Sequence, residues 1–330
     1  MKRKIKRVCI VNTSYSLLIY LSNSSIQEID ETFYFFGNGI PSVLQKNFKL
    51  RYTFDFNSNQ ILNNKLVLLF LIKYGKYFIW PFFRKSEIFA QDHLPFSPYL
   101  IGYKKYTLIE DCPNFYFRFY SNMLRLKNLQ YWREDKYKKR YLWKCIVGPT
   151  YSNINGDNSS CTALLLTDKT FIPIKLKSKI IIAKSLKEIW NNFDKEKKTL
   201  ILSRFNFSIN DVSLIRSKKK ILFTQPFSDD MYITKDEQYR IYNTIISNYS
   251  RSEIIIKTHP RDTSDYRNLF PDILVFDKPI PFQLFDLFDI KFDTAITVNS
   301  SAAKVFDYKI KIDWYGSRIS ESLLNSIGNF

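Results

Sequence analysis

The fold is decided by the stretch EIIIKTHPRD, which runs from Glu253 to Asp262. Its first half is a short run of β-branched apolar residues, a pattern that favours a buried strand of a parallel sheet. Its second half is polar, and Pro260 holds the preceding His259 out of helical conformation. We interpret this stretch as a strand that carries an imidazole at its carboxyl end.

Similar apolar runs recur along the chain and alternate with segments of helical periodicity. This alternation is typical of parallel α/β sheets with crossover helices. We expect strands at Val8 to Asn12, Thr32 to Phe36, Glu87 to Gln91 and Tyr106 to Glu110 in the first half, and at Lys220 to Thr224, Glu253 to Lys257, Ile273 to Phe276 and Thr294 to Val298 in the second. The sequence therefore predicts two α/β sheets.

The chain has 330 residues, enough for two modest cores. A polar, turn-rich stretch from Tyr151 to Ser160 is a candidate loop or linker, and a helix is expected at Ser185 to Phe193. Because the strand at Lys220 starts the second sheet, we place the boundary near Asn210. The predicted domains are residues 1–210 and 211–330.

The formal charge of +19 indicates a surface that attracts phosphates, anionic membranes or acidic sugars. The longest basic runs, Lys2 to Arg7 and Lys218 to Lys220, lack the pattern of nucleic-acid modules, so no nucleic-acid partner is expected. Four cysteines without Cys-x-x-Cys spacing indicate a reducing compartment. The first apolar stretch is broken at Asn12, too early for a signal peptide. We expect a cytoplasmic protein with at most peripheral contact with the inner membrane.

In open parallel sheets, ligands bind beyond the carboxyl ends of the strands. His259 follows such an end and lies between Lys257 and Arg261, whose charges would stabilise a bound phosphate. One interpretation is a general acid or hydrogen-bond donor to phosphate. The alternative is a structural histidine in a turn.

Two other strand ends of the second half carry polar groups. Asn299, Ser300 and Ser301 precede an expected helix whose N-terminus would hold a phosphate, although a plain N-cap is the alternative. Asp229 and Asp230 follow the strand at Lys220 and are either a candidate base with its neighbour or a solvated loop pair. Further on, Thr234 and Glu237 match a capping box, which explains Glu237 by helix initiation.

In the first half, two strand ends carry acidic groups that are candidates for acceptor binding or for a structural motif. They are Asp92, next to His93, and the pair Glu110 and Asp111. Asp92 could orient the ring of His93, and a buried ion-pair network is the alternative.

The sequence lacks several nucleotide-binding and metal-binding motifs, and this disfavours the reactions that depend on them. No Gly-x-Gly-x-x-Gly follows a strand, Gly37-Asn38-Gly39 being only a fragment, and no Walker loop occurs, which disfavours dinucleotide and nucleoside-triphosphate chemistry. There is no Asp-x-Asp pair and no His/Cys cluster, so no metal is expected.

Taken in chain order, several of these segments resemble the acidic, His-Pro and Ser-Ser motifs of bacterial sialyltransferases. They are Ile109-Glu110-Asp111, Lys257-Thr258-His259-Pro260-Arg261 and Asn299-Ser300-Ser301-Ala302. With Phe223-Thr224-Gln225-Pro226 and Gln91-Asp92-His93 added, the chain is most similar to glycosyltransferase family 52, the lipooligosaccharide sialyltransferases and their capsule-assembling relatives. The similarity runs from the first strand to roughly residue 310.

The resemblance implies a GT-B-like fold of two Rossmann-like domains, acceptor side first and donor side second, whose parallel sheets face a central cleft. It implies inverting transfer of sialic acid from CMP-sialic acid to a terminal galactose hydroxyl of a surface glycan, without metal or other cofactor. Homodimers are common among such proteins. The alternatives are a transferase for another nucleotide sugar, and a non-catalytic basic protein that binds membrane or nucleic acid.

The resemblance also implies roles for single residues. His259 would neutralise the leaving phosphate, and an aspartate would take the acceptor's proton. Asp230 is the first choice for this base, with Asp229, Asp236 and Asp111 as alternatives. Donor-binding residues are expected at Thr224, Gln225, Lys257, Arg261, Asn299, Ser300 and Ser301, with Ser300 and Ser301 on the phosphate.

One position departs from the family pattern. Cys112, followed by Pro113, stands where the acidic motif usually ends in glycine. Cysteine has less backbone freedom than glycine, so the geometry of this loop is open.

Overall fold

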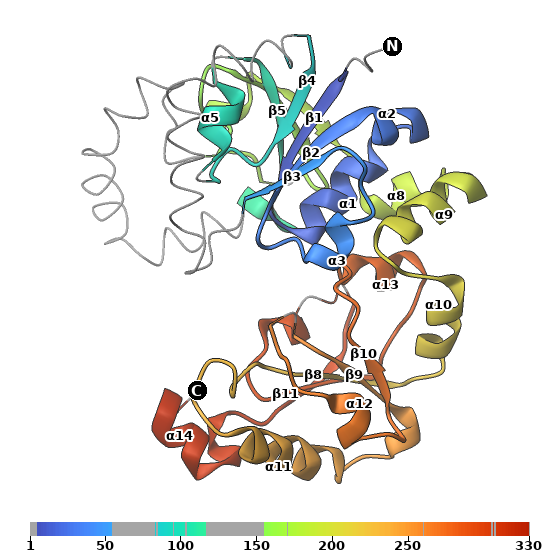
Figure 1. Cartoon of the computed structure of the whole chain (residues 1–330), viewed down its shortest axis with the longest axis vertical. Coiled ribbons are helices and arrows are strands. Elements are labelled where there is room, and N and C mark those ends of the chain that lie inside the picture. The colour runs from blue at the N-terminus through green and yellow to red at the C-terminus, as the bar shows by residue number, and fades with distance from the viewer. Residues whose placement is uncertain are drawn as a thin grey trace. The chain divides into compact units, whose positions relative to one another are not determined.

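The computed structural model describes residues 5–54, 83, 85–94, 96–102, 104–116, 155–169, 171–259, 261–304, 306 and 308–329. The chain divides into two compact units, Met1–Arg204 and Phe205–Phe330 (Figure 1). The expected boundary after residue 210 falls inside helix α10 (Ile209–Arg216), and the structure divides the chain before that helix.

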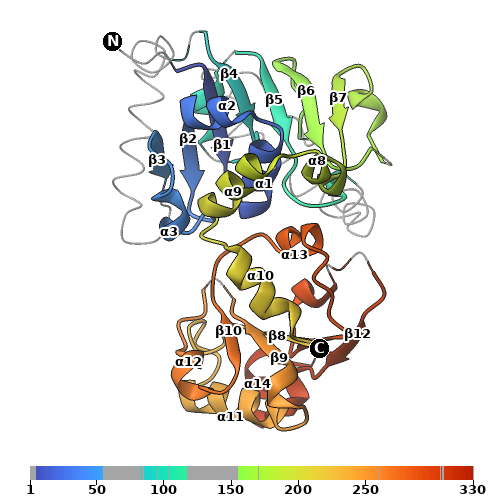
Figure 2. The same cartoon turned by 90° about the vertical axis from the view of Figure 1, so that its right-hand side faces the viewer.

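The first unit is built on a parallel sheet whose strand order in the described residues is β3-β2-β1-β4-β5-β6-β7 (Figure 2). Its strands are β1 (Arg7–Val11), β2 (Thr32–Gly37), β3 (Arg51–Phe54), β4 (Glu87–Ala90), β5 (Tyr106–Ile109), β6 (Cys161–Leu166) and β7 (Ile180–Ala183). Its helices are α1 (Ser14–Ser22), α2 (Ile26–Glu31), α3 (Ser42–Gln45), α5 (Ser97–Ile101), η1 (Ile174–Leu176), α8 (Leu186–Asn191) and α9 (Lys195–Arg204). Helices α1, α8 and α9 pack together on one face of the sheet (Figure 2).

The second unit has a parallel sheet of order β10-β9-β8-β11-β12. Its strands are β8 (Lys220–Phe223), β9 (Ile254–Lys257), β10 (Leu274–Phe276), β11 (Thr294–Thr297) and β12 (Lys311–Trp314). Its helices are α10, α11 (Lys235–Ile246), η2 (Arg251–Glu253), α12 (Tyr266–Leu269), α13 (Gln283–Leu287), η3 (Ser301–Lys304), η4 (Ser317–Ile319) and α14 (Glu321–Ile327). Apolar side chains of α11, α12 and α14 form one core with the central strands β8, β9 and β11.

All eight predicted strands are present, each within about two residues of its expected bounds. Strands β3, β6, β7 and β12 were not predicted. Strands β3, β7 and β12 lie at sheet edges and have exposed residues. Polar residues interrupt the apolar pattern in β3 and β12, whereas β7 is a four-residue apolar run. Strand β6 is buried, and it directly follows the candidate loop from Tyr151 to Ser160. The described part of that loop, from Asn155 onward, is a turn that leads into β6.

Two helix predictions have different outcomes. The expected helix at Ser185 to Phe193 is α8, and Ser185 and Glu188 form its capping box. The helix expected after Asn299 is only the short 3₁₀ turn η3 in the described residues. A turn of this length has no long row of aligned peptide dipoles. Only the local hydroxyl and N–H groups near Ser300 could therefore bind a phosphate.

Candidate active site

The carboxyl ends of β9, β8 and β11 lie side by side, because these strands are neighbours and parallel. The ladder continues one residue beyond the strand ends, where the N–H of Thr224 donates to the carbonyl of Lys257 at 3.1 Å. The structure therefore brings together the segments that begin at Thr224, Thr258 and Val298, as the strand-end argument predicted.

His259 is held from both sides by backbone hydrogen bonds. Its own N–H donates to Oγ1 of Thr224 at 3.0 Å, and its ring Nδ1 accepts from the N–H of Arg261 at 3.2 Å. Because Nδ1 is the acceptor, the neutral ring carries its hydrogen on Nε2. Burial, and then the nearby Arg261, lower the pKa of His259, so the ring is neutral at pH 7. Pro260 lies outside the described residues.

Thr224 owes its position to Asp262, which lies in the same loop as His259. The Thr224 hydroxyl donates to Oδ2 of Asp262 at 2.7 Å while accepting from His259. The Asp262 carboxylate also accepts from the hydroxyl of Tyr266 at 2.8 Å and from Nε2 of Gln238 at 3.2 Å. The Thr224 hydroxyl, expected to line the donor pocket, is thus engaged in holding the loop.

The paired carboxylates after β8 bind the loop after β9. Both oxygens of Asp230 accept from the guanidinium of Arg261, at 2.5 and 3.1 Å. Asp229 accepts from the N–H of Thr263 at 2.9 Å and from its hydroxyl at 2.5 Å. Neither aspartate is the solvated loop pair of the alternative interpretation.

Lys257 is half-buried at the end of β9. Its Nζ donates to the carbonyl of Thr258 at 3.1 Å and lies 5.6 Å from the centre of the Phe276 ring. Burial lowers the pKa of Lys257 to about 8, and the negative charge of Asp277 opposes this shift. Asp277, at the end of β10, also accepts two hydrogen bonds from Arg267, at 3.0 and 2.9 Å.

Gln225 lies between the ends of β8 and β11. Its N–H donates to the hydroxyl of Tyr242 at 2.6 Å, and its side-chain amide donates to the carbonyl of Asn299 at 3.5 Å. The N–H of Ser300 donates to Oγ1 of Thr297 at 2.7 Å.

The Ser300 hydroxyl acts as a cap of η3. It accepts from the N–H of Ala302 at 3.3 Å, and the residue is buried. The side chain of Ser301 lies outside the described residues. The plain-cap alternative for Ser300 is therefore present in the structure.

In the first unit, Asp92 does not orient His93 as expected. Its Oδ2 accepts from the hydroxyl of Tyr106 and the N–H of Gly156, both at 2.7 Å, and the side chain is buried. Burial raises the pKa of Asp92. This arrangement is a buried hydrogen-bond network with uncharged partners, whereas the alternative interpretation was an ion-pair network.

Glu110 is also a buried structural group. It accepts from the hydroxyl of Tyr15 at 2.6 Å and from the N–H and hydroxyl of Thr167. Burial raises the pKa of Glu110 to about 7. The residue thereby ties α1 to the ends of β5 and β6.

Asp111 is only partly covered, with 32% of its side chain exposed. Its Oδ1 accepts from the amide of the fully buried Gln91, whose own oxygen accepts from the N–H of Asn12 at 2.5 Å. The other oxygen lies 3.8 Å from Nε2 of His93. The structure thus orients this carboxylate through Gln91, with His93 near its second oxygen and part of the side chain exposed.

The loop after Asp111 does not need glycine at position 112. Its left-handed residue is Asn114, with φ 53°, and Cys112 is not among the residues with positive φ. Gly37 and Gly39 are needed for packing, since a Cβ on either would lie 2.0 or 2.2 Å from an oxygen of Asn12. The fragment Gly37-Asn38-Gly39 is therefore explained without a nucleotide.

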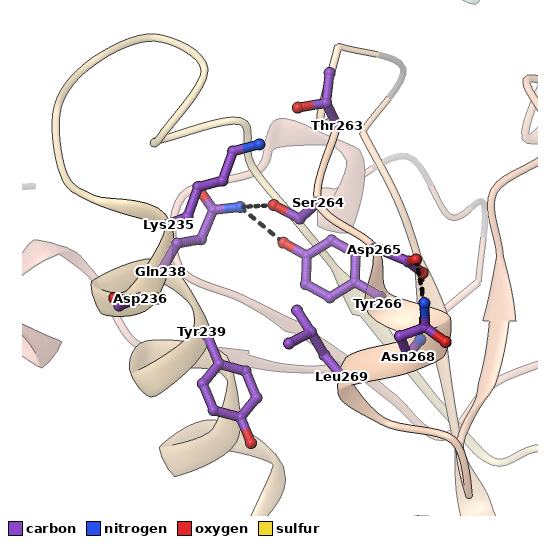
Figure 3. A pocket seen from close by; sticks show the side chains of 10 residues that line it. All are labelled: Lys235, Asp236, Gln238, Tyr239, Thr263, Ser264, Asp265, Tyr266, Asn268 and Leu269. Carbon is purple, nitrogen blue, oxygen red and sulfur yellow. Dashed lines mark hydrogen bonds between the residues drawn. The ribbon is translucent and has the colours of Figure 1, made fainter.

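A cavity of about 350 Å³ opens between α11 and α12, beside the loop that follows Arg261 (Figure 3). Gln238 points across it and donates to Ser264 and Tyr266, both at 2.9 Å. Asp236, an alternative base, is exposed on its rim in the first turn of α11.

Two carboxylates of the second unit, Asp262 and Asp277, were not predicted as site residues. Asp262 lies within the quoted stretch and Asp277 directly follows a predicted strand, so the strand-end rule applied to both. Within the described residues, no group of three His, Cys, Asp or Glu side chains could hold a metal ion, and no helix there is long and apolar enough to cross a membrane.

The sequence profile of glycosyltransferase family 52 matches residues 88–323, more than half of the chain. The chain belongs to this family. It is a glycosyltransferase, and its two parallel-sheet α/β domains form a GT-B-like fold. An uncharacterized protein of Haemophilus influenzae is 28% identical over 335 aligned positions, which cover 98% of this chain and 99% of that protein.

Two solved structures share the fold of this family 52 chain. One is a 2,6-sialyltransferase from Photobacterium sp. JT-ISH-224 in a ternary complex with CMP and lactose, with TM-score 0.54, 13% identity, and 97% of this chain and 74% of that chain covered. The other is the GT-B domain of a sialyltransferase from Photobacterium damselae, with TM-score 0.52, 14% identity, and coverage of 93% and 89%.

Proposed function

We propose that this family 52 glycosyltransferase is an inverting, metal-independent sialyltransferase. It moves sialic acid from CMP-sialic acid to a terminal galactose hydroxyl of a bacterial surface glycan, either lipooligosaccharide or capsule. The observation that carries the proposal is the state of His259, whose Nδ1 is occupied by the Arg261 N–H so that Nε2 is the donor.

The leaving group explains why one imidazole suffices. In this reaction the bond from the anomeric carbon of sialic acid to the CMP phosphate breaks, and a bond to the acceptor oxygen forms. A monophosphate leaves with less charge than a diphosphate. It can be stabilised by the Nε2–H of His259, with the positive charges of Lys257 and Arg261 nearby, where a diphosphate usually requires a metal ion.

The acceptor hydroxyl must lose its proton to a base, and we propose Asp111 for this role in place of Asp230. Asp230 has both oxygens on Arg261 and would have to leave that ion pair to accept a proton. Asp111 is oriented by Gln91, and 32% of its side chain is exposed. Orientation of a partly accessible carboxylate is what general base catalysis requires.

Two further facts support the sialyl assignment. The acidic, His-Pro and Ser-Ser segments occur at the strand ends of the two sheets. Two solved structures that share the fold are sialyltransferases, one of them with CMP and lactose bound.

Replacement of His259 tests whether the proposed site is catalytic. We expect His259→Ala to lower kcat by about 10²- to 10⁴-fold, because the leaving phosphate loses its donor. His259→Gln keeps an N–H at the place of Nε2 and should retain more activity than the alanine variant. Melting temperatures of both variants serve as the folding control. Equal kcat for wild type and His259→Ala would remove His259 from the mechanism.

A further inference from the structure

The outer edge of the first sheet carries exposed isoleucines. Strand β7 is the last strand of that sheet (Figure 2). Ile180 and Ile182 are 66% and 38% exposed, whereas Ile181 and Ala183, which alternate with them, pack against the core. Single exposed apolar residues are common, but a group of them on one short segment marks an interaction surface.

The turn before β7 adds to this surface. Ile174 in η1 is 83% exposed, and Phe171 is 44% exposed. The turn is anchored, because Leu176 is fully buried and its N–H donates to the carbonyl of Pro173 at 2.9 Å. Ile174 is therefore held outward by an ordered turn.

Lysines flank these apolar residues along the sequence. Lys169, Lys175, Lys177 and Lys184 are exposed, and the sequence from Lys169 to Lys187 contains no Asp or Glu. A recess of about 590 Å³ is lined by two of these lysines, Lys169 and Lys177, and by Phe171, Ile172, Ile181 and Ala183. We call the exposed apolar residues and these four lysines together the lysine–isoleucine edge.

We propose that the lysine–isoleucine edge docks on the surface of an anionic phospholipid bilayer. Exposed isoleucines enter the boundary between headgroups and acyl chains, while lysine stems lie along it and their ammonium groups reach the lipid phosphates. Anionic lipid attracts each nearby lysine and would attract the chain as a whole, given its charge of +19. The proposal does not depend on which sugar the enzyme transfers.

The same charge pattern disfavours protein partners of two kinds. A second copy docked through this edge would place like-charged lysines against each other, which is repulsive. Strand addition along β7 is also disfavoured, since the strand has only four residues and is followed directly by the exposed Lys184, and short edge strands and lysines at an edge commonly prevent such pairing. A bilayer phosphate surface satisfies both features of the edge at once.

Vesicle sedimentation tests the proposal with the full-length protein and without sugar substrates. The protein should bind phosphatidylcholine vesicles that contain about 30% phosphatidylglycerol and should bind pure phosphatidylcholine far less. Lys175→Gln/Lys177→Gln should weaken binding on the order of tenfold or more. Ile174→Ser/Ile180→Ser should also weaken it on the order of tenfold.

The matched control is Ile209→Ser/Leu214→Ser on α10, since Ile209 and Leu214 are 59% and 56% exposed in the second unit. It should bind vesicles like wild type. Failure of the wild type to bind, or equal losses in the control, would overturn the proposal. So would a dimer, seen by analytical ultracentrifugation, that Ile174→Ser/Ile180→Ser dissociates. Transfer to a soluble acceptor is assayed separately and should be unchanged in the edge variants.

Discussion

At the residue scale, His259 is positioned through its backbone as much as through its ring. Its N–H is held by Thr224, which is buried and is held in turn by Asp262. These contacts fix where the imidazole lies before any substrate binds. Such preorganisation matters because small displacements of a catalytic group lower the rate strongly.

Thr224→Val is a direct probe of this positioning. Valine has nearly the same shape but cannot accept the His259 N–H or donate to Asp262, so both groups lose a buried partner. We expect a loss of about 1–3 kcal/mol in the free energy of unfolding and a fall of about tenfold or more in kcat. Thr224→Ser keeps the hydroxyl and should restore kcat. If valine lowers stability but leaves kcat unchanged, Thr224 is structural only.

Comparison of Asp111→Asn with Asp230→Asn identifies the base. Both changes preserve shape and remove the charge. We expect Asp111→Asn to lower kcat by about 10²- to 10⁴-fold with little change in the donor KM. Asp230→Asn weakens the ion pair with Arg261 and should have the smaller effect on kcat. The reverse order in steady-state kinetics would return the base to Asp230.

The sequence predicted the His259 cluster because parallel strand ends must meet at one edge. It could not predict which polar groups would be buried or hydrogen-bonded to other groups of the protein. Asp92 and Glu110 look like Asp111 in sequence, but burial separates them, with exposed fractions of 3% and 1%. The capping role of Ser300 likewise depends on a 3₁₀ turn that apolar periodicity does not distinguish from a helix.

At the element scale, Glu110 joins α1 to β5 and β6 and gives this junction a pH dependence. The unfolded carboxyl ionises near pH 4.5, whereas the folded one does so near pH 7. Between these values the unfolded state has released a proton that the folded state still holds. Unfolding therefore becomes easier as pH rises through this window, by about 3 kcal/mol in all.

Glu110→Gln removes this titration while keeping an oxygen that accepts from Tyr15 and Thr167. Relative to wild type, the variant should gain up to about 3 kcal/mol in the free energy of unfolding between pH 5 and pH 8. Denaturant unfolding at the two pH values measures the difference. A stability difference that does not change with pH would contradict the raised pKa of Glu110.

Most central strands were predictable, whereas the edge strands β3, β7 and β12 were missed. Edge strand β10 was predicted because its residues form a largely buried apolar run, and the interior strand β6 was missed. Strands β1, β8, β9 and β11 are buried on both faces and read as continuous apolar runs. Strands β7 and β12 have exposed residues along their length. Strand β12 alternates charged with apolar residues, whereas β7 is a four-residue apolar run that was not assigned as a strand. The exposed residues of β7, Ile180 and Ile182, belong to the lysine–isoleucine edge.

At the scale of the whole molecule, two parallel sheets each place polar groups at their carboxyl ends. The second carries His259, Lys257 and Arg261, and the first carries Asp111. Fold alone does not fix the donor, since GT-B-like folds serve many nucleotide sugars. The choice of CMP-sialic acid depends on the monophosphate argument, and that choice is the central claim.

The most direct test is release of CMP by the purified protein from CMP-sialic acid with a lactose-terminated acceptor and excess EDTA. Metal-independent sialyl transfer predicts CMP release well above donor hydrolysis, an equal amount of sialylated acceptor, and the same rate with and without the chelator. A panel of UDP-sugars is assayed in parallel. No CMP release above hydrolysis, together with transfer from a UDP-sugar, would contradict the account.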